Sequence, residues 1–118
     1  MSAQFWDQAM AIRKRRDVPD PVQKDIWLGM IRLYALFRAA ENPISSQQLA
    51  QGLRLHGFTL GAQTVGSILR GMEKSGYITS LRTNDDGPPR KMYFATMAGR
   101  QTIEEAGSRL RAFWDLSD

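Results

Sequence analysis

The chain has 118 residues, of which 42% are hydrophobic and 24% are charged, with a formal net charge of +4 and no cysteine. This length and balance indicate one globular domain, and the absence of cysteine excludes disulfides, thiolate zinc sites and a cysteine nucleophile. The modest positive charge favours a polyanionic partner. No apolar run is long enough to span a membrane and no signal-peptide pattern opens the chain, so we expect a cytoplasmic protein.

The segment 3–16 has the pattern of an N-terminal helix. Its apolar residues fall loosely on one side and are Phe5, Trp6, Ala9, Met10 and Ile12. The basic run 13–16 closes the segment, and cations in a last helical turn complement the helix dipole. The same run also suits an arm that contacts phosphates or a helix on a membrane surface. The segment 17–21 then breaks the helix.

A strongly apolar helix is predicted from Pro21 to Ala40. Asp20 suits an N-cap followed by proline at the first helical position, and Asn42-Pro43 ends the helix. Its large apolar side chains are Ile26, Trp27, Leu28, Met30, Ile31, Leu33, Tyr34, Leu36 and Phe37. Such a helix cannot expose any broad side to water. One face should therefore pack beneath the two following helices, and the N-terminal helix or a partner subunit should cover the rest.

A short amphipathic helix is predicted to follow. Ser45 and Gln48 have the spacing of a capping box, in which each side chain accepts from the backbone N–H of the other residue. Ile44 and Leu49 are spaced to pack across this cap. Gly57 is placed to end the helix in a left-handed conformation.

The next helix, predicted from Gly61 to Ser75, has two contrasting faces. Its apolar face consists of Val65, Ile68, Leu69 and Met72. Its polar face consists of Gln63, Thr64, Ser67, Arg70 and Lys74. These polar groups can hydrogen-bond to base edges and phosphates, although an ordinary solvated face is the alternative interpretation. The connection 55–60 is longer than the turn of a simple helix-turn-helix and favours a winged helix.

Three glycines lie in or beside this helix, and each costs about 1 kcal/mol relative to alanine in a helix interior. Gly61 can occupy the N-cap. Gly66 and Gly71 lie on or near the polar face. There a missing side chain admits either a phosphate backbone or a neighbouring helix.

After Gly76 the pattern changes to strict alternation. The segments 77–82 and 91–96 are predicted to be strands that flank a turn-forming cluster at 84–89. Cations near the tip of this hairpin are Arg82, Arg90 and Lys91. They suit phosphates or the minor groove of DNA. Solubility is the alternative interpretation, and Asp85 and Asp86 support it because phosphate would repel them.

The run from Gly87 to Arg100, GPPRKMYFATMAGR, resembles the wing and following helix start of the PadR-type transcriptional regulators. The stretch 64–78 resembles the recognition helix and first wing strand of the same family. The resemblance covers 28–100 and implies a dimeric winged-helix repressor that binds palindromic operator DNA. The family usually carries a tyrosine, which makes a phosphate contact, where this chain has Gly66. The short chain after the wing resembles the compact branch with a single C-terminal helix.

The last helix is predicted from Met97 to Leu116, with Thr96 as its N-cap. Apolar residues recur at three-to-four spacing and form a seam for another helix, either in the same chain or across a two-fold axis. We favour two-fold pairing because both terminal helices carry large aromatic residues. The predicted dimer interface consists of Phe5, Trp6, Met10, Ile103, Leu110, Phe113 and Trp114.

No enzyme chemistry is predicted. His56 is the single histidine, the carboxylate pairs Glu104-Glu105 and Asp85-Asp86 are adjacent in sequence, and no phosphate-binding glycine loop occurs. We therefore expect no catalytic residue, metal or cofactor. His56 is expected to be a capping or surface residue.

The predicted fold is mainly α with a small β-hairpin, as a winged helix-turn-helix with extra N- and C-terminal helices. One domain is expected to comprise an arm at 1–19, a winged-helix core at 20–96 and a dimerisation helix at 97–118. The predicted function is a homodimeric repressor that binds double-stranded DNA at a palindromic operator. The predicted DNA contacts are Gln63, Thr64, Ser67, Arg70, Lys74, Arg82, Arg90 and Lys91.

Two alternatives remain open. The winged helix can be a protein-interaction module without sequence-specific DNA binding. The protein can also be a regulator that responds to a flat hydrophobic effector, held by Trp6 or Trp114 at the dimer interface.

Overall fold

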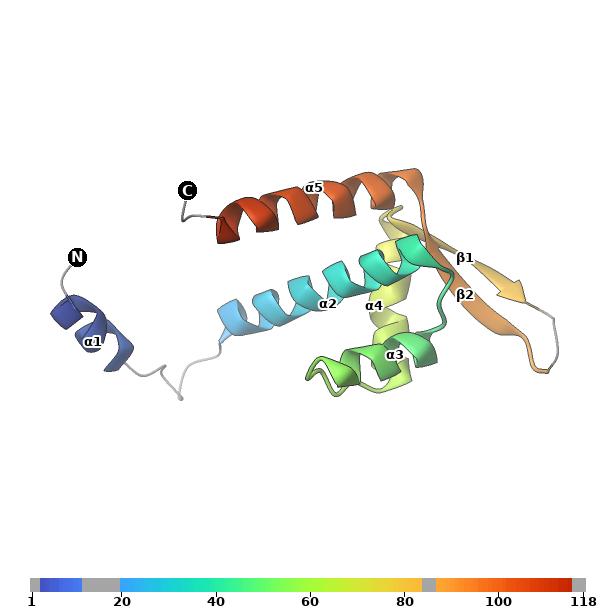
Figure 1. Cartoon of the computed structure of the whole chain (residues 1–118). Coiled ribbons are helices and arrows are strands. Elements are labelled where there is room, and N and C mark those ends of the chain that lie inside the picture. The colour runs from blue at the N-terminus through green and yellow to red at the C-terminus, as the bar shows by residue number, and fades with distance from the viewer. Residues whose placement is uncertain (1–2, 12–19, 84–86, 116–118) are drawn as a thin grey trace.

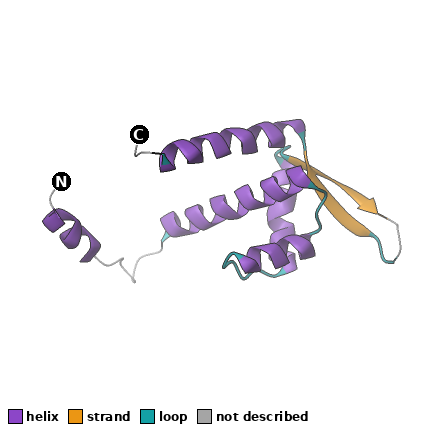
Figure 2. Ribbon diagram, in the orientation of Figure 1, coloured by secondary structure: helices purple, strands orange, loops and turns teal. Residues whose placement is uncertain are grey.

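The computed structural model describes residues 3–11, 20–83 and 87–115. In chain order the elements are α1 (Ala3–Ala11), α2 (Pro21–Glu41), α3 (Ser46–Leu55), α4 (Ala62–Lys74), β1 (Ile78–Thr83), β2 (Arg90–Ala95) and α5 (Met97–Trp114). Figure 1 shows α2 and α5 running alongside each other, with α3 and α4 next to α2 and the hairpin projecting from the end where α5 begins. In the described residues the two strands of the hairpin form the only sheet (Figure 2), so the predicted fold class is confirmed.

The described part of the N-terminal helix spans Ala3–Ala11 and lies within the predicted segment 3–16. The basic run 13–16 lies outside the described residues, as do the side chains of Phe5 and Trp6. In Figure 1, α1 lies beyond the N-terminal end of α2 rather than along it.

The helix α2 separates a buried face from an exposed apolar one. Asp20 caps it by accepting from the backbone N–H of Gln23 at 3.2 Å, and Pro21 is its first residue, as predicted. The face buried in the core consists of Ile31, Ala35, Leu36 and Ala39. Large apolar residues left exposed on the helix are Val22, Ile26, Trp27, Met30 and Phe37. The prediction that one face packs beneath the following helices is therefore confirmed.

The helix α3 begins at the predicted capping box. The backbone N–H of Gln48 donates to Ser45 Oγ at 3.2 Å, and the backbone N–H of Ser45 donates to Gln48 Oε1 at 3.0 Å. Just before this cap, the backbone of Ile44 exchanges hydrogen bonds of 2.8 and 2.9 Å with Tyr93 on β2. The start of α3 is thus tied to the base of the hairpin.

The helix α4 packs its apolar face on the core and has Gly61 at its N-cap. A Cβ atom at Gly66 would lie 3.3 Å from Arg70 Nη1 and 3.8 Å from Ser46 Oγ at the start of α3. Gly66 therefore faces the neighbouring helix α3. Of the two interpretations of this glycine, the structure supports the close approach of a helix rather than that of a phosphate backbone. A Cβ atom at Gly71 would meet nothing within 4 Å.

The strands pair antiparallel with Ser80 opposite Tyr93 and Arg82 opposite Lys91. Both strands lie within one residue of the predicted bounds, and residues 84–86 of the tip, including Asp85 and Asp86, lie outside the described residues. The predicted N-cap Thr96 accepts from the backbone N–H of Gly99, while its hydroxyl contacts the carbonyl oxygen of Gly76 at 2.7 Å. This contact fixes the start of α5 against the turn between α4 and β1.

Candidate nucleic-acid interface

The predicted polar face of α4 is exposed in the structure. With roughly 3.6 residues per turn, the side chains of Gln63, Ser67, Arg70 and Lys74 share one stripe along the helix. The opposite side carries the buried core residues of α4, which pack against α2 and α3. The polar stripe therefore faces away from the body of the protein, with Thr64 exposed on its flank.

Arg70 extends from this stripe toward the start of α3. Its Nη1 atom lies 3.3 Å from the place where a Cβ atom of Gly66 would be. A Cβ atom at Gly66 would require the exposed guanidinium to shift by only a few tenths of an ångström. The glycine thus allows Arg70 to lie close to this part of the α4 surface.

The predicted cations of the hairpin divide between its two faces. Arg82 and Lys91 are opposite each other across the strands and therefore share a face with the buried residue Tyr93. Arg90 pairs with Thr83 and lies on the other face. Arg82 and Arg90 are exposed, whereas Lys91 is only partly exposed.

Lys91 is held by a carboxylate of α4 that sequence reasoning missed. Its Nζ atom lies 3.5 Å from Glu73 Oε1, and Ser80 Oγ donates to Glu73 Oε2 at 2.6 Å. The hydrogen bond from Ser80 holds the pKa of the Glu73 carboxyl below its ordinary value of 4.5; partial burial opposes this shift, and the charge of Lys91 reinforces it. Glu73 therefore fastens the hairpin to the end of the polar helix.

Two patterns in the sequence carry the signal for the network of Glu73, Ser80 and Lys91. Strand alternation places Ser80 and Lys91 on the same face of the hairpin once the register is known. Glu73 lies on the flank of α4, between the buried and the polar faces. The rotation of α4 against the hairpin, which brings the three together, is a tertiary feature that periodicity does not contain.

Three of the predicted dimer residues are exposed on α5, Met10 is exposed on α1, and the side chains of Phe5 and Trp6 lie outside the described residues. Met10 is 77% exposed, Phe113 61% and Trp114 78%, and Leu110 is also exposed. Ile103 is half-buried and packs against the core. The sequence predicted that the N-terminal helix or a partner subunit covers the outer side of α2, but it did not identify which residues lie there. The structure shows that Met30 and Phe37 are exposed on α2 and extend the exposed apolar surface of α5.

A groove of about 570 Å³ lies between α2 and α5. Apolar residues dominate its walls and include Leu33, Phe37, Ile103 and Leu110. Trp114, predicted to hold an effector, does not line this groove. We call the groove together with the exposed apolar residues of α2 and α5 the α2–α5 face.

The described residues contain no group of three or more histidines and carboxylates placed to hold a metal ion. His56 follows α3 as its C-cap and is exposed, with its ring centroid 5.1 Å from that of Tyr34. None of the helices described is both long and apolar enough to cross a bilayer.

Residues 35–105 match the model of the PadR-like family of transcriptional regulators. The chain belongs to this family. The transcriptional regulator Rv3488 of Mycobacterium tuberculosis is 35% identical to it over 75 residues, which are 64% of this chain and 70% of that protein. The resemblance seen in the sequence is thereby confirmed, and the protein is a PadR-family transcriptional regulator.

Solved structures of PadR-like proteins share the fold. A PadR-like transcription factor from Bacteroides fragilis has a TM-score of 0.70 at 19% identity, covering 80% of this chain and 92% of that one. A PadR-family regulator from Eggerthella lenta has a TM-score of 0.66 at 22% identity, covering 96% and 92%. Bacillus subtilis PadR in complex with operator DNA has a TM-score of 0.57 at 16% identity, covering 64% and 46%.

Proposed function

We propose that this PadR-family regulator is a homodimeric repressor that binds a two-fold-symmetric DNA operator. In this proposal the segment 20–96 is the DNA-binding core, and α5 (Met97–Trp114) is the dimerisation helix. The observation that carries the proposal is the exposed polar stripe of α4, which faces away from the core beside a cationic hairpin.

The chemistry of the stripe suits a major groove. Its amide, hydroxyl and guanidinium groups can each bind base edges, and Arg70 in particular suits a guanine. Arg82 and Arg90 lie exposed on the hairpin, where they suit phosphates on either side of that groove. Because Lys91 is engaged by Glu73, we assign it a smaller share of phosphate binding than the two arginines. Thr64 and Lys74 are placed for flanking contacts.

The α2–α5 face supports the proposed dimer. Large apolar residues that stay exposed over two neighbouring helices indicate a protein-protein contact, and a two-fold pair would bury the same face on both subunits. Two α4 helices related by such a two-fold axis would suit successive major grooves of one duplex, whose repeat is about 34–36 Å. A related protein, Bacillus subtilis PadR, has been crystallised with operator DNA.

Selection of bound duplexes from a random-sequence DNA pool tests this proposal. We expect a two-fold-symmetric consensus whose affinity falls steeply as the salt concentration rises, because bound phosphates release counterions. Enrichment of no consensus, with weak binding that is equal for all duplexes, would instead support a protein-interaction module.

The α2–α5 groove favours a second property, a response to a hydrophobic effector. Its volume lies in the range of small-molecule sites and its walls are mostly apolar. A planar aromatic compound bound there should release the selected duplex. A change in tryptophan fluorescence without release would show binding that has no regulatory effect.

A further inference from the structure

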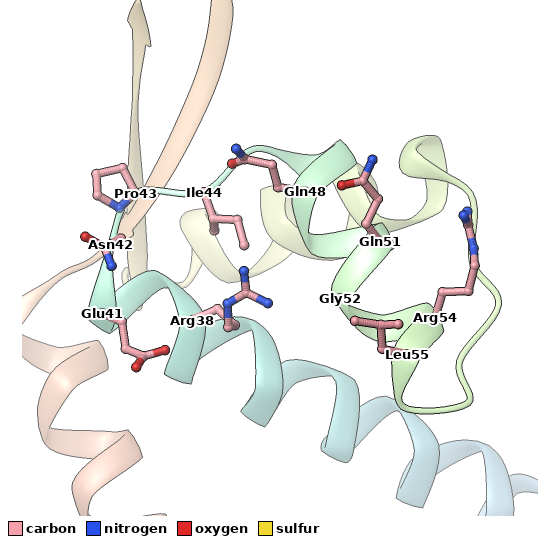
Figure 3. A pocket seen from close by; sticks show the side chains of 10 residues that line it. All are labelled: Arg38, Glu41, Asn42, Pro43, Ile44, Gln48, Gln51, Gly52, Arg54 and Leu55. Atoms are coloured by element: carbon pink, nitrogen blue, oxygen red, sulfur yellow. The ribbon is translucent and has the colours of Figure 1, made fainter.

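A second groove, different in chemistry, lies between the C-terminal half of α2 and α3. Its volume is about 650 Å³. Figure 3 shows that its lining side chains come from α2, from the connection 42–44 and from one side of α3. The polar groups include Arg38, Glu41, Gln48 and Gln51, so the groove is far more polar than the one between α2 and α5.

Arg38 is held in place at this groove without a counter-ion. Its Nη1 atom donates to the hydroxyl of Tyr34 at 2.6 Å, and its guanidinium carbon lies 5.5 Å from the centroid of the Tyr34 ring. The side chain is only partly exposed. Within residues 3–11, 20–83 and 87–115 it forms no ion pair. A fixed guanidinium with free N–H donors is therefore presented to the groove.

The sequence makes room for this arginine at Gly52. This glycine is buried inside α3, where glycine costs about 1 kcal/mol relative to alanine. A Cβ atom there would collide with the hydroxyl of Tyr34 and would lie 2.6 Å from Arg38 Nη1. The missing side chain thus lets Tyr34 and Arg38 pack directly against the backbone of α3.

We propose that the groove between α2 and α3 binds a small, polar, phosphorylated metabolite, with Arg38 binding the phosphate group. A guanidinium matches phosphate oxygens with two parallel N–H donors, which makes arginine well suited to this ligand. The Gln51 amide and the Gln48 NH2 group lie farther along the groove in Figure 3. The Gln48 oxygen already accepts from the backbone N–H of Ser45, so Gln48 can donate to a carbonyl or hydroxyl oxygen of the same molecule, and Gln51 can both donate and accept. The volume suits a ligand of nucleotide size.

The other charged side chains of the groove limit where the phosphate group can bind. The carboxylate of Glu41 also lines the groove, at the end nearest the connection to α3 (Figure 3), and it repels an anion placed beside it. Arg54 extends at the opposite end, beyond Gln51. The phosphate site therefore lies on the side of Arg38 that faces α3. No residue of α4 lines this groove, so the groove is distinct from the polar stripe of α4.

Nuclear magnetic resonance titration of the full chain tests the proposal, with adenosine monophosphate as the probe and adenosine as its uncharged reference. The monophosphate should give saturable shifts at the backbone amides of Gln48 and Gly52 and at the Arg38 side chain, and adenosine should give none. Arg38→Gln should weaken binding at least about tenfold, because a charge-assisted hydrogen bond is lost. The matched control Arg109→Gln, on the exposed surface of α5, should bind as the original chain does.

Arg38→Lys keeps the positive charge but loses the two parallel N–H donors of the guanidinium, so it should bind the monophosphate more weakly than the original chain does. Unchanged affinity would contradict a direct contact between Arg38 and the phosphate. Equal thermal unfolding midpoints of the Arg38 and Arg109 variants would exclude misfolding as the cause. Inorganic phosphate binding as tightly as the monophosphate would overturn the assignment of a metabolite. If duplex DNA shifts the same resonances and the monophosphate does not, the proposal of a metabolite site is wrong, and the groove contacts the phosphate backbone of DNA instead.

Discussion

The polar stripe of α4 and the α2–α5 face differ in whether their outer side is suited to contact with water. The stripe is polar, hydrated and held by a core helix whose other side is fully buried, and its hairpin neighbour is fixed by Glu73. The α2–α5 face is equally well anchored on its inner side, yet its outer side leaves Phe37, Phe113 and other large apolar residues in water.

This difference indicates that the α2–α5 face needs a partner for stability, whereas the stripe of α4 needs a partner only for function. Water satisfies polar side chains, so the stripe of α4 is stable without a ligand. Exposed apolar area is costly, so the α2–α5 face should be covered in the working protein. The two surfaces can be separated experimentally, because substitutions on the α4 stripe should change DNA binding and leave self-association unaffected.

The largest expected effect comes from placing a charge on the α2–α5 face. Phe37→Glu should convert the proposed dimer to a monomer. An unpaired carboxylate buried at the contact costs about 3 kcal/mol or more, which raises the dimer dissociation constant more than a hundredfold. Sedimentation equilibrium measures this constant. Gln101→Glu adds the same charge on the far side of α5 and should change nothing. A dimer that survives Phe37→Glu would place the subunit contact elsewhere.

The next effect separates base recognition from phosphate binding. Arg70→Ala on the stripe should cost about 1–3 kcal/mol on the preferred duplex and relax the preference at one position. Arg82→Ala on the hairpin should weaken all duplexes alike and lower the salt dependence by about one counterion per subunit of the proposed dimer. Fluorescence anisotropy with the selected duplex and its single-base variants distinguishes them. Identical profiles for both variants would mean that Arg70 contacts only phosphate.

Local signals in the sequence predicted most of the fold. The capping box at Ser45, the N-cap at Thr96 and the turn at Gly57 depend on residues a few positions apart, so each could be found in the sequence and each is present. The strand pattern around the hairpin was also local. Element bounds therefore agree within a few residues, apart from the end of α1, where residues 12–19 are not described.

Features that depend on distant contacts could not be predicted. Lys91 was assigned to DNA because it is a cation near a hairpin tip, but its partner Glu73 comes from another element and is brought near by tertiary packing. The roles of Arg38 and Gly52 likewise appear only when α2 and α3 are placed side by side. The outer apolar residues of α2 had the same sequence pattern as its core residues.

A smaller effect is expected from the link between the stripe and the hairpin. Glu73→Gln removes the ion pair with Lys91 and weakens the hydrogen bond from Ser80, so it should lower the free energy of unfolding by about 1–2 kcal/mol at neutral pH. Because folding lowers the pKa of Glu73, its contribution is present above 4.5 and is lost as the pH falls through the lower pKa of the folded state.

Chemical denaturation at neutral and acidic pH measures both parts of this prediction. The difference in stability between the original chain and Glu73→Gln should shrink as the pH falls below 4.5. Glu105→Gln, at an exposed position on α5, is the matched control and should show no such pH dependence. A constant difference at every pH would mean that the carboxylate charge has no part in holding the hairpin.

The smallest expected effect is a gain in stability within α4 itself. Gly71 is exposed in the helix interior and a Cβ atom there would meet nothing within 4 Å, so Gly71→Ala should stabilise the protein by about 0.5–1 kcal/mol. Thermal unfolding measures this gain. Gly99→Ala is the opposite case, because its Cβ atom would collide with the backbone carbonyl of Tyr77, and it should destabilise. If Gly71→Ala is more stable but binds the selected duplex less tightly, the open space at Gly71 admits a phosphate backbone; unchanged affinity would mean that DNA does not approach this side of α4.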